Sequence, residues 1–482
     1  MIIRTAAAIA SAAILHGAAS ADILLTTDGR FIKDRPMERK EDHVLVQFEN
    51  GEVKVPNELV EEVILDSDVE NLPRARQSWL KRKIKERAEA LEEGMEHGEW
   101  RDRYIEKSKY FDWMYTITKP IGEGIQLRFD EYYEYFKKRW KLKPDKRKGR
   151  MTVNFYRNSK QYQRVTGSPP GALAYFRFVP PYDLNACYDR LDPVETEMVL
   201  YHELSHYVQK LIDEDFKMPH WPGEGISEYF GGVLWNEEEK DFDWNLLQEG
   251  RLAEVQQDML VGKYISLRDM IVKAEYTDYT WGWAFIYFLY QDKARGDRFE
   301  KYLLGLSRDR GVKRVPFAFG LVTVTGEESL RYFMECMKLK DQDDLEDLQE
   351  EFYEYLREDL SATTNSGLEK AAIKALQVGR RLRAKRLFGE AEEAGGLSPV
   401  GCHRYAQLIK NDDRKKALNL YEQAIAADPL EATYWWWRGD LLERDDEEEG
   451  ARMQALALEL DPEIGDSIVD FTFQVDSEIE DE

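Results

Sequence analysis

The sequence predicts an α+β protein built from three successive parts. The first part, residues 22–68, contains two hairpin-type turns between short β-type segments. The second part, residues 105–360, mixes candidate strands with long amphipathic helices. In the third part, residues 366–465, small residues recur at a spacing of 33, which is typical of stacked helix pairs. Hydrophobic residues make up 43% of the 482, enough for several cores.

The first 21 residues have the order of parts found in an export signal. Arg4 provides a positive start, Ala6–Leu15 a short apolar run, and Ala19–Ala21 a small-residue cleavage site before Asp22. We therefore expect an exported protein, periplasmic or extracellular. The apolar run is too short to cross a bilayer and no later stretch is long enough, so no transmembrane segment is expected.

The overall charge argues against a nucleic-acid partner. The formal net charge is −25 and the pI is about 4.9, so phosphates would be repelled. A preference for basic substrates is a weaker inference from the same charge. The three cysteines are odd in number and far apart, which predicts neither a disulfide framework nor a metal–thiolate cluster. They are Cys187, Cys336 and Cys402.

Residues 22–68 are predicted to form a small β module. Asp28-Gly29 and Asn50-Gly51 are the hairpin turns. The strands beside them are predicted at Ile23–Thr26, Phe31–Lys33, His43–Phe48 and Glu52–Val55. The module is either a binding unit or a brace. Residues 69–104 are rich in Arg, Lys and Glu, which predicts a solvated helical linker.

A helix with clear start signals is predicted after the helix Ile125–Lys141 and the strands Met151–Tyr156 and Ala172–Phe178. Its N-cap is Asp192, with Pro193 at the first position and Glu195 three residues after the cap. Its apolar residues form one stripe, and two histidines lie on the opposite side. The stripe consists of Leu200, Leu204, Tyr207, Val208 and Leu211.

The two histidines belong to the sequence His202-Glu203-Leu-Ser-His206. Residues four apart share a helix face, so both imidazoles can bind one metal ion. Glu203 is close enough on the helix to take a proton from a metal-bound water. Glu224, on the next helix, completes a two-His, one-carboxylate set with an open fourth position, and Glu228 would orient a ligating imidazole. We expect one zinc ion per chain.

These residues carry a resemblance to a known family. His202–His206, followed by Gly223-Glu224-Gly-Ile-Ser-Glu228, resembles the gluzincin metallopeptidases, and among them the peptidase-MA-like members. The resemblance spans about residues 105–360 and implies a two-lobed catalytic domain with Glu224 as third ligand. Gly223 departs from the Asn or Ser usual there.

Tyr279 is the candidate for stabilising negative charge on the substrate. Tyr279–Leu289 resembles the Tyr-x-x-x-Trp helix of the same family, in which the Tyr hydroxyl helps to stabilise an oxyanion. Tyr276, three residues earlier, is an alternative. His220, between the two ligand helices, is either a further donor or an ordinary loop histidine.

The segment before the metal helix is the candidate substrate strand. It resembles the edge strand along which gluzincins bind an extended peptide, through backbone pairing. An ordinary core strand is the alternative. The strand carries no acidic residue to hold a free amine, which favours internal cleavage. Its candidate substrate-binding residues are Gly171, Ala172, Leu173, Ala174 and Tyr175.

The last part of the chain resembles tetratricopeptide repeats, in about two and a half units. Asp428-Pro429 and Asp461-Pro462 close successive units. The small positions are Ala384, Ala391, Ala417, Ala424, Gly450 and Ala457. The aromatic run Tyr434–Trp437 is mostly packing, although one member can line a ligand groove. We expect a protein partner here, an acidic tail over 466–482, and a repeat unit separate from the metal cleft.

Two functions from different classes follow. The first is an exported zinc metallopeptidase acting on a peptide or protein, most simply an endopeptidase. The second is an adaptor that binds protein partners through the repeats, with the peptidase fold as an inactive scaffold. The presence of both histidines, the base and the third ligand favours the enzyme. A zinc hydrolase acting on other carbonyl substrates is a third possibility.

Overall fold

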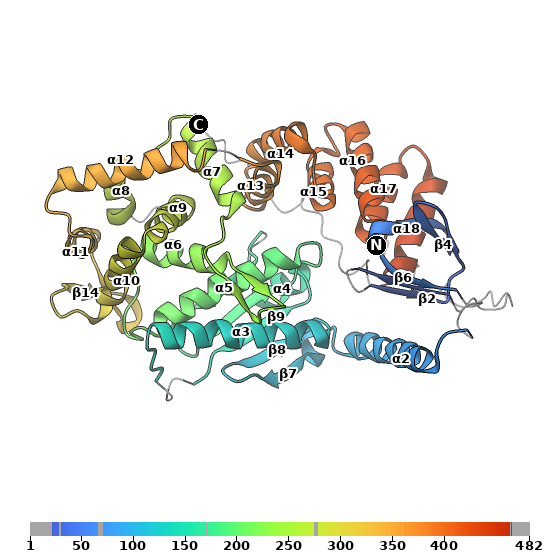
Figure 1. The fold of residues 1–482 in the computed structure, drawn as a ribbon, viewed down its shortest axis with the longest axis horizontal. Coiled ribbons are helices and arrows are strands. Elements are labelled where there is room, and N and C mark those ends of the chain that lie inside the picture. Colours follow the sequence, from blue (N-terminus) through green and yellow to red (C-terminus); the bar gives the residue numbers. More distant parts are fainter. Residues whose placement is uncertain are drawn as a thin grey trace. The chain divides into compact units, whose positions relative to one another are not determined.

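The computed structural model describes residues 22–27, 30–65, 71–145, 147, 149–169, 171–273, 278–361, 363–462 and 464. Within them the α+β class is confirmed (Figure 1). Four predictions lie outside the described residues: the export signal over 1–21, the turn at Asp28-Gly29, Tyr276, and the tail over 466–482.

The chain divides into two compact units. Among the described residues, one unit joins residues 22–86 with residues 412–464, and the other consists of residues 87–411. Helix α2 (Arg74–Glu96) crosses this division. The sequence predicted boundaries near residues 105 and 366, so the observed division differs at both places. The predicted repeat region 366–465 is split between the units.

The first unit contains two three-stranded antiparallel sheets, ordered β2-β1-β6 and β3-β4-β5. The four predicted strands are present, and β3 and β6 are additional. The strands are β1 (Ile23–Thr26), β2 (Phe31–Lys33), β3 (Met37–Arg39), β4 (His43–Phe48), β5 (Gly51–Pro56) and β6 (Val60–Ile64).

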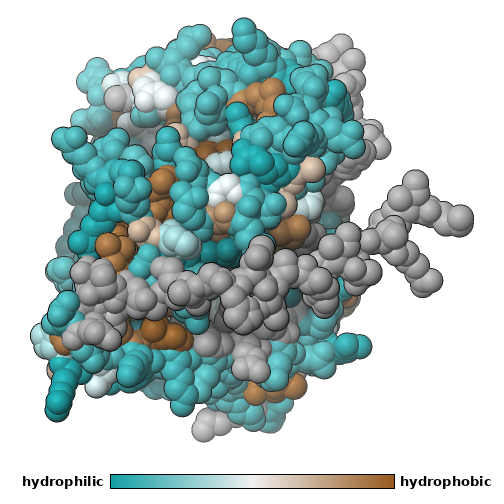
Figure 2. Space-filling model, turned by 90° about the vertical axis from the view of Figure 1, so that its right-hand side faces the viewer, coloured by the Kyte–Doolittle hydropathy of each residue, from teal (hydrophilic) through white to brown (hydrophobic). Residues whose placement is uncertain are grey.

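Three C-terminal helices complete this unit: α16 (Arg414–Ala427), α17 (Ala432–Leu442) and α18 (Glu447–Leu460). Leu430 and Leu456 share one buried core with valines of β4 and β5. The β module is therefore one part of a compact unit whose other part begins at Asp412, far away in sequence. Figure 2 shows a mostly hydrophilic face with scattered hydrophobic residues, in keeping with the net charge.

The small residues that recur in the C-terminal part of the chain lie where helices pack. All six small positions are buried. A Cβ added at Gly450 would lie 2.8 Å from the carbonyl oxygen of Gly439, so α17 and α18 approach closely only because both residues are glycine. In the aromatic run, Tyr434 and Trp437 are buried, as expected for packing residues.

The second unit is built on a five-stranded mixed sheet, ordered β10-β11-β9-β8-β7. Strand β10 lies at one edge and pairs antiparallel with β11, with Ala174 opposite Ala186. Helix α3 packs on the sheet, where Phe129 lies edge-on to Trp113. The elements are β7 (Tyr104–Lys107), β8 (Asp112–Tyr115), α3 (Lys119–Arg139), β9 (Thr152–Tyr156), α4 (Ser159–Thr166), β10 (Ala174–Arg177) and β11 (Asp183–Cys187).

Helices make up most of the remainder of this unit. Helix α6 packs between α5 and α9, and α7 packs against α9 and α13. The elements are α5 (Pro193–Lys210), α6 (His220–Gly231), β12 (Leu234–Asn236), β13 (Asp241–Asp243), α7 (Glu249–Leu260), α8 (Leu267–Val272), α9 (Asp278–Gln291), α10 (Lys293–Arg308), β14 (Arg314–Pro316), β15 (Val322–Val324), α11 (Gly326–Met337), α12 (Gln342–Glu358), α13 (Asn365–Gln377), α14 (Arg381–Gly395) and α15 (Pro399–Ile409).

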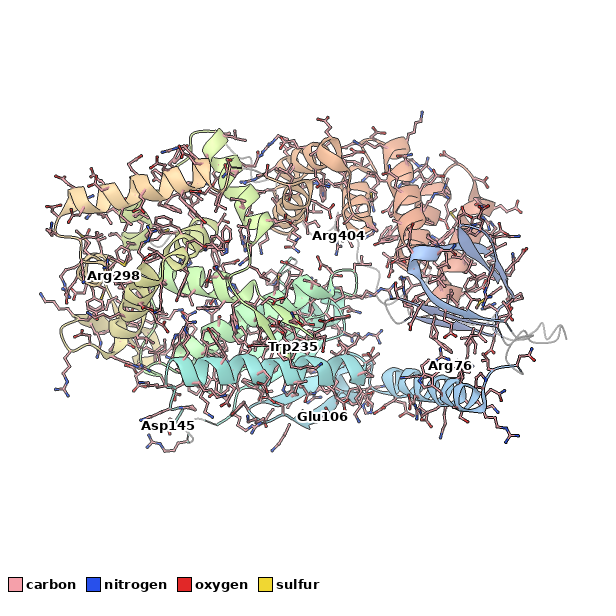
Figure 3. All side chains as sticks on the ribbon, viewed as in Figure 1. Arg76, Glu106, Asp145, Trp235, Arg298 and Arg404 are labelled. Carbon is pink, nitrogen blue, oxygen red and sulfur yellow. The ribbon has the colours of Figure 1, made fainter. Side chains whose placement is uncertain are left out.

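The helices α13–α15 belong to this unit because they are attached to its core. Arg404 on α15, labelled in Figure 3, is 6% exposed and donates to the Asp189 carboxylate at 2.7 Å. On α14, Arg386 donates to the Gln257 side chain of α7 at 2.7 Å. These contacts agree with the grouping of α13–α15 with the rest of Arg87–Asn411.

The three cysteines are buried and free, so they form no disulfide. Within the described residues, every helix is too short or too polar to span a bilayer.

Candidate metal centre

Helix α5 carries the two histidines and begins as its sequence predicts. The Asp192 carboxylate accepts a hydrogen bond from the Glu195 backbone N–H at 3.0 Å, and Pro193 occupies the first turn. All five residues of the predicted apolar stripe are buried. The opposite side of the helix therefore presents His202 and His206 to a cleft.

A close approach of two helices brings the third residue to the histidines. A Cβ on Gly231 of α6 would lie 3.0 Å from the Cα of His202, so no larger residue fits without movement. Helix α6 thus crosses α5 at the level of His202. Glu224, two turns before Gly231, consequently faces both imidazoles.

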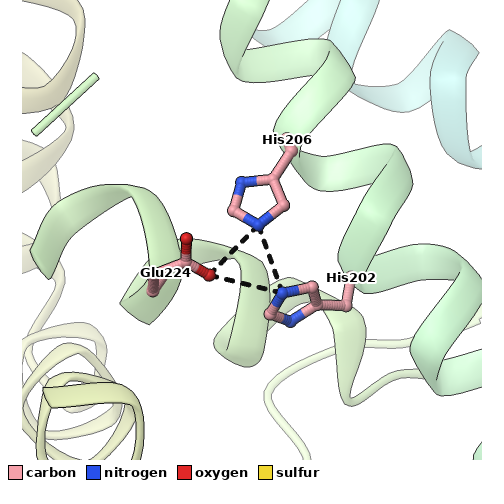
Figure 4. A group of neighbouring side chains, drawn as sticks. All are labelled: His202, His206 and Glu224. Atoms are coloured by element: carbon pink, nitrogen blue, oxygen red, sulfur yellow. Dashed lines mark hydrogen bonds and ion pairs between the residues drawn. The ribbon is translucent and has the colours of Figure 1, made fainter. Parts of the chain in front are cut away.

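The three side chains converge on one point (Figure 4). Glu224 Oε2 lies 3.1 Å from His206 Nε2 and 3.5 Å from His202 Nε2, and the two Nε2 atoms are 3.2 Å apart. Ligands held at about 2.0–2.1 Å from a tetrahedral zinc are separated from one another by roughly 3.3 Å. The donor atoms therefore have the type and spacing of three zinc ligands.

Glu228 supports His202 from behind. One carboxylate oxygen of Glu228 lies 3.5 Å from His202 Nδ1, the ring nitrogen turned away from the cluster. Arg251 of α7 holds the same carboxylate with two hydrogen bonds, at 2.6 and 2.8 Å, and donates a third to Glu254 at 2.9 Å. Such outer contacts set the tautomer and orientation of a ligating imidazole.

His206 has a separate support. Its Nδ1 lies 3.1 Å from the Ser227 hydroxyl, which also accepts a hydrogen bond from Gln209 Nε2 at 2.9 Å. With Nε2 facing the cluster as an acceptor, Nδ1 carries the hydrogen and donates it to Ser227. Gln209 is itself held by the Gly223 carbonyl at 3.0 Å. Both imidazoles thus direct Nε2 toward Glu224 and the centre of the cluster.

The electrostatics of the cluster favour a cation. Burial opposes the charged form of Glu224, but the two imidazoles outweigh it and hold the pKa of Glu224 below its ordinary value. Burial likewise opposes protonation of His202, yet Glu224, Glu228 and Glu203 outweigh it and raise the pKa of His202. Three carboxylates around one imidazole create a negative potential that a divalent ion would neutralise.

The remaining predicted site residues also line the cleft. Glu203 projects into it from α5, next to the first histidine. Tyr279, at the start of α9, stacks near His202 with ring centroids 6.4 Å apart. His220 occupies the first turn of α6 rather than a loop and lies edge-on to Tyr279 at 5.4 Å. Burial lowers the pKa of His220, which favours its neutral form.

The cleft has a volume of about 1070 Å³ and contains the predicted substrate segment. Ala174 and Tyr175 belong to the edge strand β10, whereas Gly171, Ala172 and Leu173 form its approach. The backbone of β10 pairs with β11 on one side, and within the described residues no strand pairs with the other side. The unpaired side of β10 is the kind of backbone edge that can take up an extended chain.

Several residues of the site were not predicted from the sequence. Ser227 could have been found, because it lies one turn from Glu224 on the same helix. Arg251 had no local signal, since it reaches the cleft from α7. Lys374, on α13, belongs to a stretch rich in Lys and Arg, which indicates a basic surface but not the cleft that this surface lines. Lys217, whose ammonium lies 4.9 Å from the Phe178 ring centre, was also missed.

We expect Glu228→Gln to weaken zinc binding roughly 10–100-fold, because the amide no longer stabilises the N–H of His202 by its charge. Glu254→Gln is the matched control, because Glu254 is the other carboxylate that Arg251 holds and it does not contact His202. Chelator competition measures both affinities. Equal loss of zinc affinity in the two variants would show that Glu228 acts through its ion pair with Arg251 and not through His202.

Comparison with known proteins gives no independent assignment. No family model matches the chain, and no curated protein matches its sequence. The functional inference therefore rests on the geometry of the cluster and its cleft.

Proposed function

We propose that this protein is an exported zinc metallopeptidase. The observation that carries the proposal is the triangle of His202, His206 and Glu224, whose donor atoms are 3.1–3.5 Å apart in a cleft that also contains Glu203. These three residues would hold the zinc ion. When bound, zinc supplies Lewis acidity and a water of lowered pKa.

Glu203 is the proposed general base. It is adjacent in sequence to the ligand His202 and opens onto the same cleft, so it is within reach of a water that attacks the substrate carbonyl. It accepts the proton of that water and then delivers it to the leaving amine. Both transfers need only one carboxylate that faces the scissile bond.

Tyr279 is the proposed donor to the carbonyl oxygen as negative charge develops there. A neutral hydroxyl stabilises that charge without repelling the metal. Its ring contacts the rings of both His202 and His220, and Tyr279 lines the cleft. His220, kept neutral by burial, supports the Tyr279 ring through an edge-to-face contact.

Two features of the cleft support a peptide substrate. The first is the unpaired side of β10. The second is a set of exposed apolar side chains along the cleft, which can cover the side chains of an extended peptide. This set consists of Tyr175, Val194, Leu234, Leu247 and Val378, each 38–52% exposed.

The adaptor alternative is less well supported by the site. A scaffold needs neither a base in the cleft nor support for both imidazoles, yet Glu203, Glu228 and Ser227 are all in place. The test is hydrolysis of a mixed peptide library by purified protein, with and without a chelator. Cleavage that stops on chelation and returns with zinc supports the peptidase. Peptide binding without cleavage in the zinc-loaded protein supports the adaptor.

Metal content gives a second test. We expect about one zinc per chain in protein purified without added metal, and less than a tenth of that in the variant His202→Ala/His206→Ala. His43→Ala/His97→Ala removes two other histidines, neither of which lines the cleft, as the control. Elemental analysis measures all three proteins. Full zinc content in the His202/His206 variant would place the metal elsewhere.

A further inference from the structure

One wall of the cleft has a charge opposite to that of the protein as a whole. Residues 370–389 contain seven Lys or Arg and no Asp or Glu, in a chain of net charge −25. Four of these cations line the cleft from α13, α14 and the turn between them: Lys370, Lys374, Arg380 and Arg383. We name these four residues the basic wall.

Within the described part of the chain, two members of the basic wall, Lys374 and Arg380, have no close ionic partner. Of the other two, Lys370 lies 3.8 Å from Glu249 and Arg383 lies 3.8 Å from Asp258. Lys374 and Arg380, by contrast, have no carboxylate within 4 Å among the described residues. These two cations are therefore left to be solvated by water or neutralised by an anion that binds in the cleft.

Two of the three acidic side chains that interact electrostatically with Lys374 are engaged elsewhere. Glu228 and Glu254 are both held by Arg251, and Glu254 also accepts a hydrogen bond from Thr280 at 2.7 Å. Lys374 also interacts electrostatically with Glu195, but the two side chains are too far apart to form an ion pair. Lys374 thus remains available to a carboxylate that enters the cleft.

The basic wall stands at a defined end of the substrate strand. A Cβ on Gly171 would lie 2.4 Å from the Gln377 carbonyl oxygen, so the end of α13 abuts the segment leading into β10. The cation at the other end, Lys217, lies over the Phe178 ring. The two free cations are therefore at the end where β10 begins.

Strand direction then predicts which part of a peptide reaches the basic wall. Antiparallel pairing is the commoner arrangement, and β10 already pairs antiparallel with β11. A peptide added antiparallel to β10 would run from the Arg177 end toward Ala174. Its C-terminal portion would then lie beside Lys374 and Arg380.

We infer that Lys374 and Arg380 bind a carboxylate in the C-terminal portion of the substrate. This rests on the proposed peptidase function and adds a substrate class, acidic peptides. The carboxylate belongs either to an Asp or Glu side chain or to the free C-terminus. Both sources present the same anion, and Lys and Arg bind it in the same way.

The test uses full-length zinc-loaded protein and four quenched fluorescent peptides. They differ only in Glu or Gln after the cleaved bond and in a free or amidated C-terminus. We expect kcat/KM to be roughly tenfold higher for one or both carboxylate-bearing forms, with the preference falling as salt increases. Loss on amidation identifies the terminal carboxylate as the ligand, and loss with Gln identifies the side chain.

In Lys374→Gln/Arg380→Gln we expect this preference to fall below about twofold, mainly through a higher KM for the carboxylate-bearing peptides. Lys385→Gln is the matched control, because Lys385 lies in the same basic stretch but does not line the cleft. An equal fall for all four peptides, or the same effect in the control, would overturn the inference.

Binding separates this inference from the proposed function. If wild-type protein cleaves none of the peptides, the peptidase proposal fails. Fluorescence anisotropy of the same peptides then decides on the basic wall alone: tighter binding of the carboxylate forms, lost in the double variant, supports it. Cleavage without any preference for a carboxylate overturns the inference that Lys374 and Arg380 bind a carboxylate, and leaves the peptidase proposal intact.

Discussion

Glu203→Gln is expected to lower kcat by roughly 10²–10⁴-fold, because an amide cannot accept the proton of the attacking water. The substitution preserves the shape of the side chain and leaves His202, His206 and Glu224 unchanged. Zinc content and melting temperature should therefore match those of the wild type. Initial rates on one quenched peptide, together with elemental analysis of the same samples, measure the effect.

A second acidic residue provides the comparison for this result. Glu237 is exposed and does not line the cleft, so Glu237→Gln should leave kcat within about twofold of the wild type. Turnover near the wild-type value in Glu203→Gln would remove this residue from the mechanism. Loss of zinc in that variant would instead show that the carboxylate supports the metal.

Removing helices α13–α15 is expected to reduce kcat/KM at least tenfold, even on short peptides. The reason is a chain of contacts. Gly367 and Lys370 of α13 pack on Glu249 and Gly250 at the start of α7. Helix α7 carries Arg251, whose two hydrogen bonds hold the carboxylate behind His202. Without α13, α7 loses one side of its packing and the cleft loses one wall.

The comparison requires two fragments, residues 87–411 and residues 87–365. The first is the compact unit seen in the structure and should retain short-peptide hydrolysis, whereas the second should lose it and melt at a lower temperature. Rates and thermal melts of both fragments measure the difference. Equal activity would restore the interpretation from the sequence, in which everything after residue 366 is separate from the cleft.

Local features of the fold were predictable because they depend on neighbours in the chain. The start of α5 follows from Asp192 and Pro193, and the buried stripe follows from helical periodicity. Three of the strands in the first unit begin and end where turn residues and alternation predict. Strands β3 and β6 were missed. Strand β6 pairs with β1, far from it in the sequence, so no hairpin turn marks it. Strand β3 has only three residues, too few for an alternating pattern.

The site could be predicted in part for the same reason. His202 and His206 share a helix face by spacing alone, and Glu224 with Glu228 forms a second such pair. The distances between these pairs were not predictable, because they depend on the close crossing of α5 and α6 at Gly231. Arg251 was not predictable either, since an ion pair between distant helices leaves no periodic pattern in the sequence.

By itself, the sequence determined which residues can bind a metal, which face of α5 is buried, and which segments form helix pairs through small residues. Only the tertiary structure decided how these parts are grouped. It joins the β module to α16–α18 in one core and places α13 against α7 as a wall of the cleft. The physical reason is that helical periodicity specifies that a face is buried, but not which surface covers it. The matching of apolar surfaces and charges between distant segments decides that, and here it brings Lys374 and Arg380 to the metal cleft.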